Sequence, residues 1–409
     1  MYSRRLASAL VCSALLVASP SARPVAPEVR ALWVVRTALV SPAAITSMVA
    51  AARSAGFNTL VVQVRGRGDA YYASRAEPRA SALAAQPVSF DPLAQVLQQG
   101  HAAGLKVHAW VNVNLVADAG DVPTNGRHVV NRHPEWLMVP ADLAATIGDP
   151  RGRAFVATLA SWTRSQTASV EGLYTSPIPE HAGDYVVGVV RDLVSRYQVD
   201  GVHFDYVRYP GPAFDCSREA LRAFKSEVAP GLPSQERRAL DRAEHSHRLA
   251  WIQRYPARWE EFRRLRLTAL MHRLRGVVKQ KRPRALVSAA VVPDSATAVT
   301  SRFQDWPGWM AKGLLDVLCP MAYSTDDAVF RQQVEHARAA ARGRPVWAGI
   351  GAYRLTGDQT LRQILAARRL GVDGVILFSY DSLVNPSRGP DNLSRIGAQA
   401  FGQPHAPAW

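Results

Sequence analysis

The sequence is poor in cysteine, and it lacks the short motifs of several large enzyme classes. It has three cysteines in 409 residues, of which Cys216 and Cys319 lie beyond the N-terminal segment. Two cysteines cannot form the disulfide framework of a small secreted scaffold. Cys319 lies in an apolar, strand-like run, which favours a buried free thiol. No G-x-S-x-G elbow and no Walker A phosphate loop occurs, which argues against serine hydrolases of that type and P-loop enzymes.

The chain also lacks an apolar run long enough to cross a membrane. The N-terminal apolar run, Leu6–Val17, is shorter than the roughly 20 residues of a transmembrane helix. It follows Arg4 and Arg5, and it ends in small residues around Ala22, which is the three-part pattern of a secretory signal peptide. We therefore predict that residues 1–22 are a signal peptide. The mature protein is predicted to be periplasmic or extracellular, with no transmembrane segment.

Long blocks of basic residues are missing as well, although the formal net charge is +16. Nearly all of the positive charge is arginine, dispersed along the chain. Dispersed charge, the predicted export and the absence of a run in which basic and aromatic residues alternate all argue against a nucleic-acid partner. Solvated surface arginine is the simplest interpretation. An anionic envelope surface or an anionic glycan is the alternative partner for this charge.

Eight short apolar runs alternate with amphipathic helical patterns through the rest of the chain. The runs are rich in β-branched residues and apolar on both faces, as in a parallel sheet that is covered on both sides. The predicted strands are Ala31–Arg36, Thr59–Val64, Leu105–Val113, Gly201–Val207, Ala285–Val292, Leu315–Ala322, Val346–Ile350 and Gly374–Tyr380.

This order of elements predicts an α/β protein, a (β/α)8 TIM-type barrel over residues 28–402, with a C-terminal tail at 403–409. A doubly wound open sheet is the alternative, but no G-x-G-x-x-G follows the first strand. Long helical and loop insertions are predicted at about 66–90, 114–179 and 210–284. In such a barrel they lie at the C-terminal face, where active sites are built.

The stretch DGVHFDYVRYP, Asp200–Pro210, carries the clearest functional signal. Strand alternation places His203 and Asp205 inside the barrel, with Asp205 near the C-terminal mouth, and Val202, Phe204 and Tyr206 toward the helices. An unpaired carboxylate in a dry interior costs several kcal/mol. Asp205 therefore either forms a structural ion pair with Arg208 or lies open to a substrate. Polar and aromatic residues at the ends of other strands favour the second interpretation.

Sugar binding fits these strand ends, because aromatic rings stack on sugar rings while amides and charged groups bind hydroxyls. Glycosidic cleavage needs two carboxyl groups. We predict Asp205 as one of them, with Asp381 as the first and Asp294 as the second candidate partner; helix capping is the alternative role of Asp294. The predicted substrate-binding residues are Arg36, Gln63, Arg65, Asp69, Tyr71, Trp110, Asn112, His203, Tyr206, Arg208, Met321, Tyr323 and Tyr380.

These segments also resemble a known family. The stretches EVRALWVVRTALVSPAAITSMVAAARSAGFNTLVVQVRGRGDAYY, VHAWVNVN, HPEWLM, VDGVHFDYVRYP and VLCPMAYS are similar to the glycosyl-hydrolase-like 10 family. The resemblance implies a TIM-type barrel of glycoside-hydrolase ancestry in an exported bacterial protein, and at least one relative acts on peptidoglycan glycan strands. Many members carry a second acid directly after the first, as in HFDD. Here Tyr206 follows Asp205, so that role cannot be transferred.

Three functions follow for testing. The first is an exported glycoside hydrolase that cleaves a bacterial polysaccharide such as peptidoglycan glycan strands. The second is a non-catalytic glycan-binding barrel, which the missing second acid favours. The third is a metal-dependent hydrolase or deacetylase that uses His108, His203 and Asp205. The absence of HExxH, C-x-x-C and an H-x-H in the first strand argues against the third, and we predict no cofactor or metal.

Overall fold

The structure is a computed structural model that describes residues 27–389 and 391–402. The predicted signal peptide and the predicted C-terminal tail lie outside the described residues. Within the described part, no helix is long and apolar enough to cross a lipid bilayer. Cys216 and Cys319 are both buried and free.

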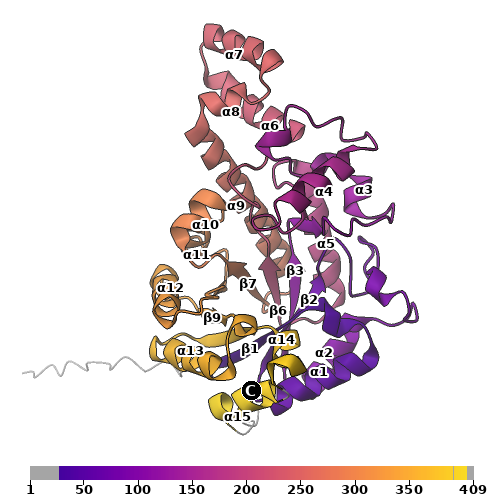
Figure 1. Cartoon of the computed structure of the whole chain (residues 1–409), viewed down its shortest axis with the longest axis vertical. Helices are drawn as coiled ribbons and strands as arrows, with labels where there is room; N and C mark the ends of the chain where they lie inside the picture. The colour runs from indigo at the N-terminus through magenta and orange to yellow at the C-terminus, as the bar shows by residue number, and fades with distance from the viewer. Residues whose placement is uncertain (1–26, 390, 403–409) are drawn as a thin grey trace, which may run out of the picture.

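Eight parallel strands form one nearly closed barrel, as predicted (Figure 1). Their order is β8-β7-β6-β3-β2-β1-β10-β9. The first and last strands of this order, β8 and β9, are joined by parallel bridges between Leu318 and Val346 and between Met321 and Gly349. The strands are β1 (Val29–Val34), β2 (Thr59–Arg65), β3 (Lys106–Asn112), β6 (Gly201–Asp205), β7 (Leu286–Val291), β8 (Val317–Pro320), β9 (Trp347–Ile350) and β10 (Gly374–Phe378). Each lies within or beside one of the eight predicted segments.

Helices cover the outside of the barrel, and capping side chains fix where several of them begin. Ser41, Asp91 and Asp326 each accept a hydrogen bond from a first-turn amide, which satisfies donors that the helix itself leaves free. The covering helices are α1 (Pro42–Ser54), α2 (Pro92–Ala102), α5 (Glu180–Arg196), α9 (Pro256–Lys281), α10 (Ser295–Ser301), α11 (Trp306–Ala311), α12 (Asp327–Ala340), α13 (Gly357–Arg369), α14 (Tyr380–Leu383) and α15 (Asn392–Phe401).

Two long insertions build a separate layer with apolar clusters of its own. The first contains the antiparallel pair β4 (Leu115–Ala117) and β5 (Leu173–Tyr174), with α3 (Val129–Arg132) and α4 (Phe155–Ser165). The second contains α6 (Arg218–Val228), α7 (Ser234–Ser246) and α8 (Ala250–Arg254). Helices α6 to α8 gather at one end of the molecule, and α9 runs from them back along the barrel (Figure 1). Their cluster includes Phe224, Trp251 and Trp259.

Short 3-10 helices complete the fold. They are η1 (Arg36–Leu39), η2 (Ser81–Leu83), η3 (Pro134–Trp136), η4 (Ala141–Leu143), η5 (Ala229–Gly231), η6 (Ala352–Arg354) and η7 (Pro386–Arg388).

Side-chain alternation along β6 positions the functional residues. Val202 and Phe204 belong to the large apolar cluster between strands and helices, so His203 and Asp205 face the barrel interior, as predicted. Tyr206 departs from the predicted alternation. Strand β6 ends at Asp205, and Tyr206 adopts a positive φ of 53°, which turns its side chain to the lining of the cavity at the barrel mouth.

Candidate active site

A cavity of about 480 Å³ opens at the C-terminal ends of the barrel strands. Active sites of TIM barrels lie at this face, and the volume is in the range of small-molecule sites. Most of its lining comes from strand ends, and Glu171 and Tyr353 come from other segments. The lining residues are Trp33, Val35, Arg36, Gln63, Arg67, Trp110, Asn112, Glu171, Asp205, Tyr206, Arg208, Ala290, Val292, Pro293, Met321, Tyr323, Tyr353 and Phe378.

Asp205 forms part of this lining although only 6% of its surface is exposed. Its Oδ1 accepts the backbone N–H of Tyr206 at 2.6 Å and Nη1 of Arg208 at 3.0 Å. Among the described residues none donates a hydrogen bond to Oδ2. Burial raises the pKa of Asp205, and the Arg208 guanidinium offsets part of that effect. Asp205 is therefore a carboxyl group that holds a proton more readily than an exposed aspartate.

Glu171 is a second carboxylate in the same cavity, and the strand pattern gave no sign of it. Its Oε2 accepts the hydroxyl of Tyr174 at 2.7 Å. Arg208 Nη2 lies 3.9 Å from its Oε1, and the Arg208 guanidinium also lies 4.0 Å above the Tyr206 ring. One buried arginine thus contacts both acids. The only sequence signal for Glu171 is its position in a long insertion at the C-terminal face.

Polar groups at the side of the cavity form a chain of hydrogen bonds. Arg36 Nη1 donates to Gln63 Oε1 at 3.0 Å, and Trp110 Nε1 donates to Asn112 Oδ1 at 2.8 Å. The Asn112 amide donates in turn to the carbonyl of Gly66 at 2.9 Å. These contacts fix the orientation of the side chains that would meet hydroxyl groups.

Aromatic rings line the other side of the cavity. Trp33, Tyr323 and Phe378 contact one another, with Tyr323 and Phe378 stacked at 5.6 Å between ring centroids. Tyr353 packs edge-on against Tyr323 and is 39% exposed. Flat rings beside hydrogen-bonding groups suit a ligand that has an apolar face and polar edges.

Several predicted substrate-binding residues do not line the cavity. Arg65 is buried in an ion pair with Glu77, and Asp69 accepts the backbone N–H of Arg67 at 2.9 Å. Tyr71 is buried, which raises the pKa of its hydroxyl to about 12. The residues outside the lining are Arg65, Asp69, Tyr71, His203 and Tyr380, and those within it are Arg36, Gln63, Trp110, Asn112, Tyr206, Arg208, Met321 and Tyr323.

Asp381 and Asp294, the two predicted partner acids, are also absent from the lining. Asp381 lies in α14, and its Oδ1 accepts the hydroxyl of Thr37 at 2.6 Å. Asp294 caps α10 by accepting the backbone N–H of Thr297 at 2.8 Å. The hydrogen bonds from Thr297 lower the pKa of Asp294. Each of these aspartates therefore accepts a hydrogen bond outside the cavity, and the acid that lines the cavity with Asp205 is Glu171.

The histidines of the metal-dependent alternative are held apart from the cavity. Trp33 Nε1 lies 3.1 Å from His203 Nε2, and Ser288 Oγ lies 2.9 Å from His203 Nδ1. Both ring nitrogens of His203 are therefore engaged. His108 lies one layer deeper, opposite Gly201. Residues 27–389 and 391–402 contain no group of three histidine, cysteine, aspartate or glutamate side chains placed to hold a metal. The geometry does not support this alternative.

Neutral buried histidines make stability depend on pH. Burial lowers the pKa of His108 to about 4 and that of His203 to about 3, whereas an unfolded histidine titrates near 6.5. Below that pH the unfolded chain binds protons that the folded chain does not, so stability falls as pH falls. Between pH 7 and pH 5 each histidine should cost about 2 kcal/mol of unfolding free energy.

Urea denaturation at both pH values measures this effect. His108→Leu should lose about 2 kcal/mol less than the wild type over the same interval, since it removes one buried histidine with a lowered pKa. An equal loss in the variant and the wild type would show that His108 is not a buried neutral histidine.

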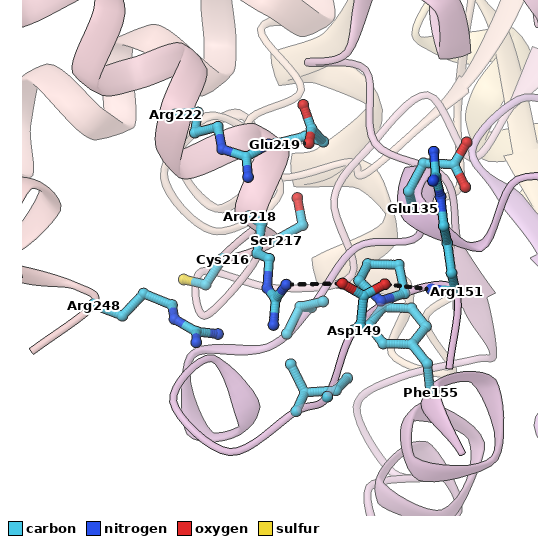
Figure 2. A pocket seen from close by; sticks show the side chains of 14 residues that line it. Glu135, Asp149, Arg151, Phe155, Cys216, Ser217, Arg218, Glu219, Arg222 and Arg248 are labelled. Carbon is cyan, nitrogen blue, oxygen red and sulfur yellow. Dashed lines mark hydrogen bonds and ion pairs between the residues drawn. The ribbon is translucent and has the colours of Figure 1, made fainter. Parts of the chain in front are cut away.

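A second hollow, of about 220 Å³, lies between the two insertions (Figure 2). It is lined by Arg151, Arg218, Arg222 and Arg248 together with acidic residues. Arg218 pairs with Asp149 at 3.2 Å and Arg222 with Glu219 at 2.6 Å. Burial raises the pKa of the nearby Cys216 thiol to about 12, so it is not a thiolate at neutral pH. The acidic residues that line this hollow balance most of the positive charge of its four arginines.

The fold defines the class to which the chain belongs, the (β/α)8 TIM-type barrels, with a cavity at the C-terminal ends of the strands. The glycoside hydrolase domain of PgaB (BpsB) from Bordetella bronchiseptica superposes with a TM-score of 0.62 at 16% identity, over 91% of this chain and 99% of that domain. A β-galactosidase from Rahnella sp. R3 superposes with a TM-score of 0.61 at 14% identity, over 93% and 57%. These likenesses concern the fold.

The sequence profile of the glycosyl hydrolase-like 10 family matches residues 28–351, and the chain belongs to that family. Glycosyl hydrolase DigH of Escherichia coli (strain K12) is 30% identical over 162 residues, which cover 38% of this chain and 33% of DigH. Glycosyl hydrolase YngK of Bacillus subtilis (strain 168) is 27% identical over 161 residues, which cover 38% of this chain and 26% of YngK. The match thus spans about a third or less of these relatives.

Proposed function

We propose that the protein is an exported glycoside hydrolase that cleaves the glycan of a bacterial polysaccharide, with peptidoglycan glycan strands as the first substrate to test. The observation that carries this proposal is Asp205, a buried carboxyl group with a raised pKa that lines an aromatic cavity at the barrel mouth. Such a group can donate a proton to the oxygen of a glycosidic bond as the bond breaks.

The other side chains of the cavity have roles that fit a sugar chain. Tyr323, Tyr353 and Phe378 offer faces and edges for sugar rings, and Gln63 and Asn112 offer groups for hydroxyls. Names of relatives add support, because DigH and YngK are called glycosyl hydrolases and the PgaB domain a glycoside hydrolase domain. The substrate and the export of this chain are part of the proposal.

One observation favours a second function, a glycan-binding barrel without catalysis. Tyr206 follows Asp205 directly, where the family resemblance implies a second acid, and its ring lies under the Arg208 guanidinium. Such a barrel would retain the aromatic rings and bind glycan without cleaving it. The hydrolase and the glycan-binding barrel differ in one measurable outcome, because only the hydrolase releases cleaved glycan.

Incubation of the purified protein with peptidoglycan tests both functions. One sample contains intact peptidoglycan and the other contains glycan strands stripped of their stem peptides. We expect new reducing ends, measured by reductive labelling, to appear in the stripped strands. A protein that sediments with the glycan but releases no product on long incubation would support the binding function and contradict the hydrolase.

A further inference from the structure

We propose that Glu171 is the second catalytic carboxylate of the cavity and acts as the general base of an inverting hydrolysis in which Asp205 is the acid. This inference rests on the proposed hydrolase function. The family resemblance implies a second acid directly after Asp205, where this chain has Tyr206. The proposal places that second acid in the insertion at 114–179 instead.

The position of Glu171 relative to Asp205 is set by Arg208. Nη1 of Arg208 lies 3.0 Å from Asp205 Oδ1, and Nη2 lies 3.9 Å from Glu171 Oε1. Because one rigid guanidinium contacts both acids, their carboxyl groups lie within about 10 Å of each other, a bound that admits the spacing of about 6.5–9.5 Å in inverting glycosidases. Arg208 is only 6% exposed, which limits its freedom to move.

The insertion holds Glu171 over the end of β6 through backbone contacts. The amide of Asn114 donates to the carbonyl of Tyr206 at 3.2 Å, and the amide of Thr175 donates to the carbonyl of Asn114 at 2.7 Å. Gly172, next to Glu171, has a φ of 154°, and a Cβ there would lie 2.1 Å from the carbonyl oxygen of Ala117. Only glycine fits so close to β4, so the segment next to Glu171 is held against β4.

The two acids lie in unlike environments, which separates their roles. The side chain of Asp205 is 8% exposed and that of Glu171 is 38% exposed. Glu171 also accepts the hydroxyl of Tyr174 at 2.7 Å, which orients one of its two carboxyl oxygens. A buried carboxyl group with a raised pKa beside a more exposed carboxyl group is the arrangement that separates acid and base roles in glycosidases.

The reaction balances with these two groups and one water. Glu171 takes a proton from the water, whose oxygen forms a bond to the anomeric carbon. The glycosidic C–O bond breaks, and its electron pair stays on the leaving oxygen, which takes the proton of Asp205. The new hydroxyl lies on the face opposite the leaving group, so the anomeric configuration inverts.

The test compares acid variants on stripped glycan strands. Glu171→Gln should lower kcat by about 10²- to 10⁴-fold with little change in KM, and Glu180→Gln, at an exposed residue in the first turn of α5, should retain full activity. Asp381→Asn and Asp294→Asn should also retain activity. Proton NMR of the first product should show inversion. Full activity in Glu171→Gln, or a product with retained configuration, would overturn the proposal.

A second measurement does not depend on turnover. Infrared difference titration follows the protonated carboxyl band that Asp205→Asn removes. Burial is the main cause of the raised pKa of Asp205, and the charge of Glu171 adds to it, so Glu171→Gln should lower that pKa and Glu180→Gln should not. An unchanged titration would overturn the pairing even if the enzyme is active. A shifted titration in a protein that cleaves no glycan would instead overturn the hydrolase function, and the catalytic role of Glu171 with it.

Discussion

Asp205→Asn is expected to lower kcat on stripped glycan strands by about 10²- to 10⁴-fold while the fold stays intact, because general acid catalysis contributes on that order. The asparagine side chain has nearly the same volume, and its oxygen can still accept from the Tyr206 amide and Arg208. It cannot release a proton at neutral pH. Circular dichroism and a thermal melt would confirm the fold of the variant.

The leaving group provides a sharper readout of the same variant. A dinitrophenyl glycoside departs without a proton, so Asp205→Asn should lose much less activity on that substrate than on glycan strands. In the wild type, activity on strands should fall as pH rises through the raised pKa of Asp205, because the acid must carry its proton. Asp326→Asn, at an exposed helix cap, is the matched control. Full activity of Asp205→Asn on strands would refute the assignment.

Glu77→Gln should destabilise the protein by about 3–5 kcal/mol, the cost of leaving a buried charge without its partner. Arg65 and Glu77 are 1% and 2% exposed, and Arg65 Nε lies 2.8 and 3.0 Å from the two carboxylate oxygens. Arg65 also donates to the carbonyl of Val113 at 3.2 Å. The pair therefore ties the 66–90 insertion to the end of β3.

Guanidinium denaturation at pH 7 measures this cost. Glu28→Gln is the control, because the Glu28–Arg368 pair is about 30% exposed and exposed pairs contribute about 0–1 kcal/mol. Similar losses of unfolding free energy in Glu77→Gln and Glu28→Gln would mean that water reaches Arg65 in solution. The comparison is independent of any substrate.

The sequence predicts the barrel well because its strands carry a signal of their own. Each strand is a short, mostly apolar run, and the alternation along β6 places Asp205 inside and Phe204 outside, as the structure has them. Arg65 shows where alternation stops. The pairing of β2 with β3 shifts in register between Gln63 and Arg65, so Gln63 reaches the cavity while Arg65 meets Glu77.

The proposed partner acid, Glu171, could not be found from strand patterns. The prediction of Asp381 assumed that the last strand continues to Tyr380, but β10 ends at Phe378 and α14 begins at Tyr380, which brings Asp381 beside Thr37. Glu171 reaches the cavity through long-range contacts between an insertion and the end of β6. Local sequence patterns do not predict contacts between residues that are far apart in the chain, so the structure was needed to find them.

The pairing of β1 with β10 determines whether the order of segments along the chain could be changed by circular permutation. Strand β1 pairs with both β2 and β10, and Arg30 donates to the carbonyl of Phe401 at 3.5 Å. The two ends of the described fold therefore lie side by side. A circularly permuted polypeptide, joined across this junction and opened in the polar helix α7, would keep every strand pair of the barrel.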